Sequence, residues 1–291
     1  MQRKAIVGTR SDRLALPKPG DRLRLGSAGL RVSPICLGIT GSAACVRAAF
    51  DAGVNFFFIS GDLHWPLYEG TRKGLESLLR GNSRRRDEIV VGIVSYFEQP
   101  WFGYGTQFRE AVRAVPGLKH ADLLIAGGVS ARWSFDERLP TLQAAKGELY
   151  LGTRAIGASL HQRKLALRAE KSRAVDISYI RYNAAHPGAR RDVLPHLPKK
   201  RRTLLFNFKS VLSPLPSRKL LGLAASDWMP EPTDYYRFVL SAPEFDGLLC
   251  SPWTPKEVRA LARALDKGPL SHEEQDRMLR LCAGLDANKD W

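Results

Sequence analysis

The sequence predicts an α/β protein of the (β/α)8 or TIM-barrel class, a closed barrel in which eight parallel strands alternate with helices. From Ile35 onward, short apolar runs rich in branched residues alternate with amphipathic segments, which is the pattern of repeated strand-helix units. The strand candidates are nearly continuous in apolar residues, as in 89–94, and this indicates a parallel sheet buried on both faces. Eight such units exceed the roughly six strands usual in an open doubly wound sheet, so a closed barrel is favoured.

Each element is expected where such a run or an amphipathic repeat occurs. The expected barrel strands are 35–39, 55–60, 88–96, 122–127, 151–159, 176–183, 203–210 and 247–252. The expected helices between or after them include 44–53, 69–80, 106–115, 136–147, 161–172 and 254–267.

The whole chain of 291 residues is expected to form one barrel domain with additions at both ends. Short strands at 4–10, 22–25 and 30–33 lie outside the rhythm and predict an N-terminal β-hairpin plug within about residues 1–33. Ser271 followed by Glu274 is a capping box, which predicts an extra C-terminal helix to Cys282. The Pro-rich stretch of about 211–233 is irregular and is expected either to cover a ligand or to be an inert surface excursion.

The chain is strongly basic, with 45 Lys and Arg against 29 Asp and Glu, a net charge of +16 and a pI near 10.0. Such a charge attracts phosphates, acidic peptides or acidic carrier domains, although scattered charges also fit a merely solvated basic surface. The tight basic runs at 84–86 and 199–202 have no interleaved aromatic residues, and this disfavours nucleic acid as a partner.

The four cysteines show no C-x-x-C spacing, which argues against a zinc site and against a secreted disulfide scaffold; no metal is expected. The N-terminus has no apolar signal core, and no stretch approaches about 18 apolar residues. We therefore expect a cytoplasmic protein without membrane association. The sequence does not indicate an oligomeric state.

Several motifs, in order along the chain, resemble those of the aldo-keto reductases. They are LGSAGLRVS at 25–33, CLG at 36–38, AAFDAGVNFF at 48–57, DLLI at 122–125, AIGAS at 155–159, YN at 182–183 and TPKEV at 254–258. The resemblance implies a (β/α)8 barrel with NADPH across the carboxyl ends of the strands. It also implies a catalytic tyrosine that gives a proton to a carbonyl, assisted by a lysine, an aspartate and a histidine.

Three of those four positions depart from the family pattern. The position of the aspartate is Phe58, that of the lysine is Val94, and that of the histidine is Gly127. A tyrosine is a poor acid or base near neutral pH unless charged neighbours tune it, so ordinary aldo-keto reductase catalysis is not expected here.

The loop after the second barrel strand is the candidate catalytic site. The family tyrosine corresponds to His64 or Tyr68, depending on where a gap is placed, and Asp62 lies two residues before His64. Histidine exchanges protons near neutral pH, and an aspartate could orient its imidazole. In the alternative interpretation, Asp62 caps a turn, Trp65 and Tyr68 pack over the barrel, and His64 is only solvated.

The resemblance also implies residues that would bind NADPH. Ser159 matches a serine that holds the nicotinamide amide, Tyr179 or Ser178 takes the place of a glutamine, and Phe206 or Phe208 would stack on the ring. Lys209, Ser210 and backbone amides near Ser251 could reach the pyrophosphate.

Substrate contacts are expected from the same end of the barrel. Arg181 and Asn183 could bind a carboxylate or phosphate, and Trp65 and Trp101 could form an apolar wall; packing in loops and turns is the alternative for all four.

The first functional hypothesis is an aldo-keto reductase-like oxidoreductase with an altered active site, which reduces a carbonyl or imine of a specialised metabolite with NADPH. The first alternative is a cofactor-independent acid/base enzyme on the same barrel: a lyase, isomerase, cyclase or hydrolase. The second alternative is a non-catalytic binding protein. The expected partner is a small molecule, or a substrate on an acidic peptide or carrier.

Overall fold

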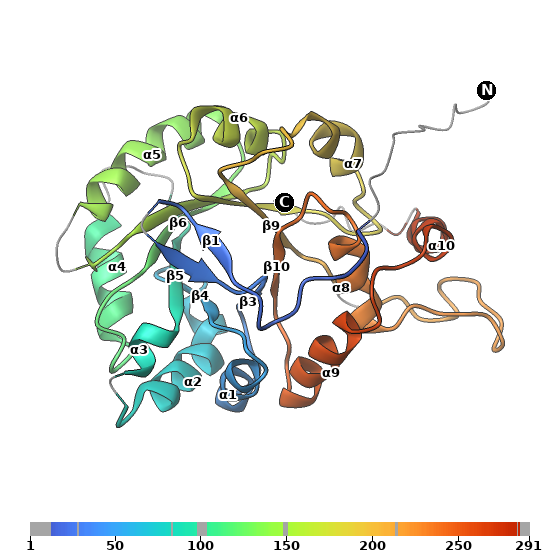
Figure 1. The fold of residues 1–291 in the computed structure, drawn as a ribbon, viewed down its shortest axis with the longest axis horizontal. Helices are drawn as coiled ribbons and strands as arrows, with labels where there is room; N and C mark the ends of the chain where they lie inside the picture. Colours follow the sequence, from blue (N-terminus) through green and yellow to red (C-terminus); the bar gives the residue numbers. More distant parts are fainter. Residues whose placement is uncertain are drawn as a thin grey trace.

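The computed structural model describes residues 13–27, 29–82, 84–97, 104–147, 151–212, 215–283 and 285. Eight parallel strands close a barrel in the order β10-β3-β4-β5-β6-β7-β8-β9 (Figure 1), which confirms the predicted (β/α)8 class. The barrel strands are β3 (Ile35–Leu37), β4 (Phe56–Ser60), β5 (Val90–Ser95), β6 (Leu123–Val129), β7 (Ala155–Leu160), β8 (Ile177–Arg181), β9 (Leu204–Phe208) and β10 (Gly247–Cys250). Each of the eight predicted strands overlaps one of them.

A helix follows each barrel strand, and these helices lie around the outside of the barrel (Figure 1). They are α1 (Ala43–Asp51), α2 (Glu69–Leu79), α4 (Tyr104–Arg113), α5 (Arg132–Lys146), α6 (Leu165–Ser172), α7 (Ala189–Asp192), α8 (Pro232–Leu240) and α9 (Pro255–Leu265). Shorter or additional helices are η1 (Trp65–Tyr68), α3 (Arg85–Glu88), η3 (Leu194–His196) and α10 (His272–Cys282). The predicted capping box of α10 is present, since Glu274 N–H donates to Ser271 Oγ over 3.1 Å and Ser271 N–H donates to Glu274 Oε2 over 2.7 Å.

Some predicted boundaries were wrong for local reasons. The strand expected from 151 begins at Ala155, because Gly152 has a φ of +59° and the Thr153 hydroxyl donates to the Ala121 carbonyl over 2.8 Å. The helix expected from 161 begins at Leu165, because His161 N–H still bonds the Val129 carbonyl at the end of β6.

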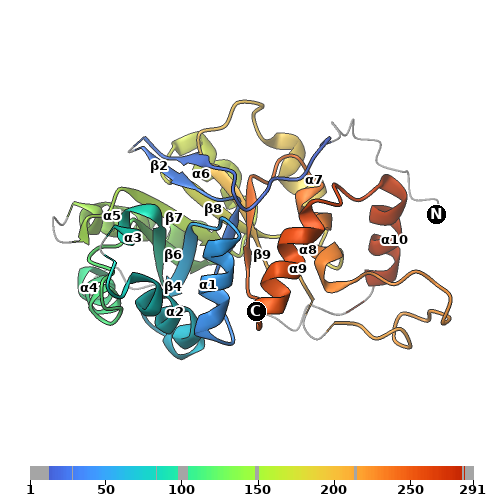
Figure 2. The same cartoon turned by 60° about the horizontal axis from the view of Figure 1, so that its bottom comes forward.

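The irregular segment expected at about 211–233 ends earlier than predicted, because α8 begins at Pro232. Proline at the first helical position and the Glu231 N–H bond to Asp234 Oδ2 over 2.9 Å fix this start. Residues 215–231 extend outward beside α8 and α10 (Figures 1 and 2), and the Arg277 guanidinium lies 5.7 Å from the Trp228 ring centroid. A ligand-covering role for this segment stays a prediction.

An antiparallel hairpin of β1 (Leu23–Leu25) and β2 (Leu30–Val32) covers one end of the barrel (Figure 2). Asn55, directly before β4, accepts from Ser33 N–H over 2.7 Å and donates to the Arg31 carbonyl over 2.9 Å. The hairpin therefore lies at the amino ends of the strands, as the predicted plug requires, and leaves the carboxyl ends to the site. The strand expected at 4–10 lies outside the described residues.

A buried ion pair fixes α3 at the same end of the barrel. Arg86 and Asp122 are 2% and 0% exposed and 2.6 Å apart, and Asp122 also accepts from Val91 N–H over 2.9 Å. Burial alone would raise the pKa of Asp122, but hydrogen bonds from His120, Arg86 and Val91 outweigh it and lower the pKa to about 2.

Candidate active site

The barrel interior is filled by aromatic rings from opposite strands. Phe58 on β4 and Tyr179 on β8 have ring centroids 5.6 Å apart, and Tyr179 lies 5.8 Å from Phe206 on β9. Because β4 and β8 are opposite each other in the strand order, these rings meet inside the barrel. Register partners on parallel strands face the same side, so Ser159, paired with Tyr179, also faces inward.

The positions that depart from the resemblance lie within this apolar interior. Phe58 is 2% exposed, Val94 is fully buried, and Gly127 lies at the carboxyl end of β6. No charged tuning group therefore stands at these three positions, as the sequence indicated.

Tyr96, which the sequence analysis did not select, occupies the space above Gly127. A Cβ atom on Gly127 would lie 2.7 Å from Cδ1 of Tyr96 and 2.6 Å from Cγ2 of Val94. Only glycine at position 127 therefore allows the Tyr96 ring to lie there without a shift of its neighbours. The Asp62 carboxylate fixes the backbone of Tyr96, because it accepts from Tyr96 N–H over 2.9 Å.

Tyr96 connects the two candidate proton donors. The phenol groups of Tyr68 and Tyr96 lie close enough to shift each other's pKa, and the His64 ring packs edge-on against the Tyr96 ring with centroids 4.3 Å apart. Burial raises the pKa of Tyr96 to about 12, and the Asp62 carboxylate adds to the increase. Burial also raises the pKa of Tyr68 well above the usual value, so both phenols keep their protons at neutral pH.

The structure brings His64 and Tyr68 together through Tyr96, but it does not join Asp62 to His64. Among the described residues, the Asp62 carboxylate bonds backbone N–H groups of Tyr96 and Leu63 and has no hydrogen bond to His64. The imidazole of His64 is therefore held by its contact with the Tyr96 ring and not, as the sequence suggested, by the Asp62 carboxylate. Trp65 stacks under the Arg72 guanidinium at 3.6 Å and is half-buried.

The carboxyl ends of the barrel strands and the connections that follow them form the barrel mouth. A second set of predicted residues lies on the other side of this mouth. Arg181 ends β8 and is the register partner of Phe208, the last residue of β9. The Phe208 ring stacks on His161, which follows β7, with centroids 5.5 Å apart. Desolvation, together with the charges of Arg181 and Lys209, lowers the pKa of His161 below its ordinary value.

Asn183 and Ser210 are committed to the backbone and side chains of this region. The Asn183 amide donates to the Lys209 carbonyl over 2.8 Å and accepts from His186 N–H over 2.8 Å, so it holds the turn after β8. The Ser210 hydroxyl is 2% exposed and hydrogen-bonds the Asn207 side chain. Both side chains position Lys209, whose φ of +54° is in the left-handed region.

The remaining predicted cofactor and substrate residues lie at different depths, from the buried barrel interior to the exposed surface. Tyr179 and Phe206 are fully buried inside the barrel, so Phe208 is the phenylalanine of this pair that reaches the mouth. Ser159 is 9% exposed near the mouth, and Ser251 is exposed after β10. Trp101 lies outside the described residues.

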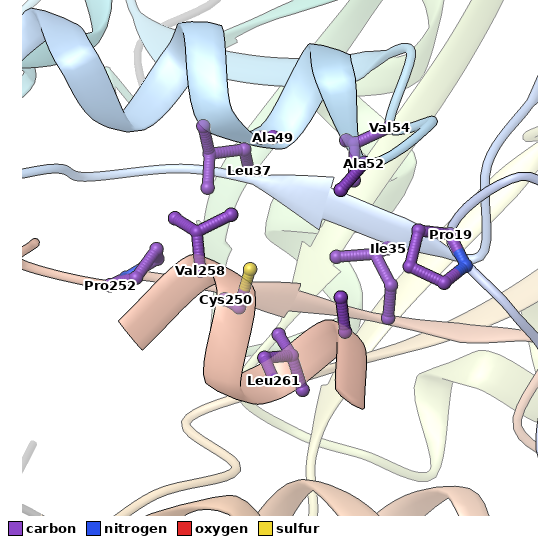
Figure 3. A pocket seen from close by; sticks show the side chains of 11 residues that line it. Pro19, Ile35, Leu37, Ala49, Ala52, Val54, Cys250, Pro252, Val258 and Leu261 are labelled. Atoms are coloured by element: carbon purple, nitrogen blue, oxygen red, sulfur yellow. The ribbon is translucent and has the colours of Figure 1, made fainter. Parts of the chain in front are cut away.

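One apolar crevice lies outside the barrel wall, between α1, α9 and strands β3 and β10 (Figure 3). Leu37, Cys250 and Val258 are among its lining side chains, and none of the predicted site residues is. Among the described residues, no group of three or more His, Cys, Asp or Glu side chains could hold a metal ion. No helix in that part of the chain is both long enough and apolar enough to span a membrane.

Comparison with known proteins shows which solved structures have a similar fold. No family model and no curated protein matches the sequence. The structure is similar to the holo form of an aldo-keto reductase from Bacillus halodurans, with a TM-score of 0.65 and 16% identity over 92% of this chain and 96% of that one. It is also similar to a Pseudomonas aeruginosa protein classed as an aldo-keto reductase, with a TM-score of 0.61 and 20% identity over 86% of this chain and 97% of that one.

The chain has the aldo-keto reductase fold. The predicted resemblance is thereby confirmed for the architecture. Within this aldo-keto reductase fold, the polar groups near the mouth are Tyr96, His64 and Tyr68 on one side and His161 and Arg181 on the other. Tyr96 and His161 were missed because neither belongs to a motif. The glycine pair at 127–128, opposite an aromatic residue that follows the preceding strand, is the signal that could have pointed to Tyr96.

Proposed function

We propose that this protein is an oxidoreductase that reduces a carbonyl or imine, preferably an imine, with NADPH at the mouth of the barrel. The observation that carries the proposal is the linked group of His64, Tyr96 and Tyr68, which gathers proton-bearing side chains at the end of an aldo-keto reductase barrel.

His64 is the proton donor in this proposal, and the two tyrosines are positioning residues. Tyr68 is 4% exposed and its phenol lies beside that of Tyr96, so it does not reach a substrate at the mouth. His64 is half-buried in the same loop, and its ring is held by the Tyr96 ring. Histidine is also the side chain best suited to proton transfer near neutral pH.

The absence of charged tuning groups favours an imine over a ketone. Phe58 and Val94 offer no charge to a proton donor, and the phenols have raised pKa values, which makes them weak acids. An imine is basic and can bind its proton before hydride arrives, so it needs less help from an acid than a ketone does.

The donor set at the mouth fits a nicotinamide dinucleotide. Ser159 faces inward near the mouth, the Phe208 ring is half-buried there, and Lys209 and Ser251 lie at the ends of β9 and β10. NADPH would supply hydride when bound. Ser159 would bond its amide, Phe208 would contact its ring, and Lys209 would attract its phosphates.

Exposed apolar side chains support an additional organic partner at the mouth. Leu63 and Leu67 in the loop after β4, Trp133 at the start of α5 and Trp253 after β10 are each more than half exposed. All four follow the carboxyl ends of strands, where a bulky substrate, or one carried on an acidic peptide, would contact them.

The proposal is tested by titrating the full chain with NADPH and following cofactor fluorescence, then measuring reduction of a cyclic imine. We expect saturable binding, and we expect His64→Ala to lower kcat by about 10²-fold or more while the Kd of NADPH stays within about twofold. Tyr68→Phe should lower kcat less than His64→Ala, because Tyr68 acts through Tyr96. A failure to bind millimolar NADPH would remove the proposal and favour a cofactor-independent acid/base enzyme.

A further inference from the structure

The mouth has a cationic side formed by residues at the ends of three neighbouring strands, β7, β8 and β9. His161 follows β7, Arg181 ends β8, and Lys209 follows β9 directly. The connections that begin there contain no acidic residue at 161–164, 181–188 or 208–219.

These side chains converge instead of spreading over the surface. The Phe208 ring spans from β9 to contact the His161 ring, with centroids 5.5 Å apart, although β8 lies between their strands. Arg181 lies two residues after Tyr179 on β8, so both side chains are on the same side of the sheet. Tyr179 points into the barrel, and the side chain of Arg181 therefore starts from the inner face, as does that of its register partner Phe208. Arg181 forms no ion pair with any described residue.

The electrostatics agree with this geometry. The positive charges of Arg181 and Lys209 add to desolvation in lowering the pKa of His161. A cluster of like charges that is kept together at the inner edge of a barrel is expected to gain from a bound anion.

We propose that His161 and Arg181 form an oxyanion site that binds the carboxylate or phosphate of the substrate. The site lies across the mouth from His64, because β8 and β9 are opposite β4 and β5 in the barrel order. A substrate bound at Arg181 would then extend its reducible group toward His64. The anion site itself needs only these residues; its assignment to the substrate rests on the proposed function.

The probe is sulfate, whose charge is constant above pH 4, and the readout is the NMR titration of the His161 ring in the full chain. Sulfate should raise the pKa of His161 in a saturable manner, whereas sodium chloride at equal ionic strength should not. Arg181→Met should weaken sulfate binding about tenfold or more, as expected for loss of a charged hydrogen-bond donor. Arg280→Met removes the same charge from an exposed position on α10 and should leave binding unchanged.

Three results would overturn the assignment. The first is no saturable effect of sulfate at 100 mM, and the second is an equal effect of the Arg181 and Arg280 substitutions, which would show only the overall charge. The third is loss of the sulfate effect when NADPH is saturating, which would assign the cations to the cofactor phosphates. If NADPH does not bind but sulfate still titrates His161 through Arg181, the proposed reduction fails while the anion site stands.

Discussion

Replacing Tyr96 with phenylalanine tests whether the two buried hydroxyls form one unit. Tyr68 is 4% exposed, so in Tyr96→Phe its hydroxyl loses a polar neighbour in a place that water barely reaches. A buried donor without a partner costs about 1–3 kcal/mol. Tyr68→Phe should cost less, about 0.5–1.5 kcal/mol, because the half-buried Tyr96 hydroxyl can turn toward water.

The double variant gives the decisive number. When both hydroxyls are absent, no buried hydroxyl is left without a polar partner. Tyr68→Phe/Tyr96→Phe should therefore be no less stable than Tyr96→Phe alone. The free energy of unfolding of the four proteins, from urea denaturation at pH 7, should give a coupling of about 1–2 kcal/mol between the sites. Costs that add within about 0.5 kcal/mol would refute the interaction between the two hydroxyls and, with it, the role of Tyr96 as the link between Tyr68 and His64.

Three further predictions concern stability. Gly127→Ala forces its Cβ against Tyr96 and Val94 and should cost about 1–3 kcal/mol in urea denaturation, whereas Gly20→Ala, with no atom within 4 Å of the added Cβ, should cost less than about 0.5 kcal/mol. The pKa of Tyr96 is raised to about 12, so the folded state favours the neutral phenol. The free energy of unfolding should therefore fall by roughly 2–3 kcal/mol as pH rises from 10 to 12. In Tyr96→Phe the decrease over this pH range should be smaller by that amount. The pKa of Asp122 is lowered from 3.8 to about 2, so its contribution of about 2 kcal/mol to the free energy of unfolding is present above pH 4 and lost as pH falls toward 2. Asp122→Asn should remove that pH dependence and cost about 3–5 kcal/mol at pH 7. An unchanged midpoint of acid unfolding in this variant would contradict the ion pair with Arg86.

The barrel was predictable because its signals are local. A strand such as β5 is apolar along its whole length, and a capping box such as that of Ser271 and Glu274 lies within one turn. The helix α8 has comparable local signals in Glu231 and Pro232. It was not predicted, because the prolines around it favoured an irregular segment.

The site was predictable only in part, because its contacts cross between strands. Asp62, His64 and Tyr68 are close in sequence and were selected together, but their arrangement depends on Tyr96, which comes from the next strand connection. The choice between Phe206 and Phe208 likewise depended on the register of β9 against β8, where Tyr179 pairs with Phe206 and Arg181 with Phe208. Sequence spacing fixes neither of these relations.

The residues at positions 58 and 127 both have aromatic neighbours inside the barrel. The Phe58 ring packs against Tyr179 at 5.6 Å and against Tyr68 at 6.1 Å, so a carboxylate there would be buried among rings without a cation. A side chain at 127 would displace Tyr96, and Tyr68 would then lose its polar neighbour. Introducing one polar residue at a time at these positions should therefore destabilise the barrel without creating a proton donor, because aromatic rings fill the space around each position.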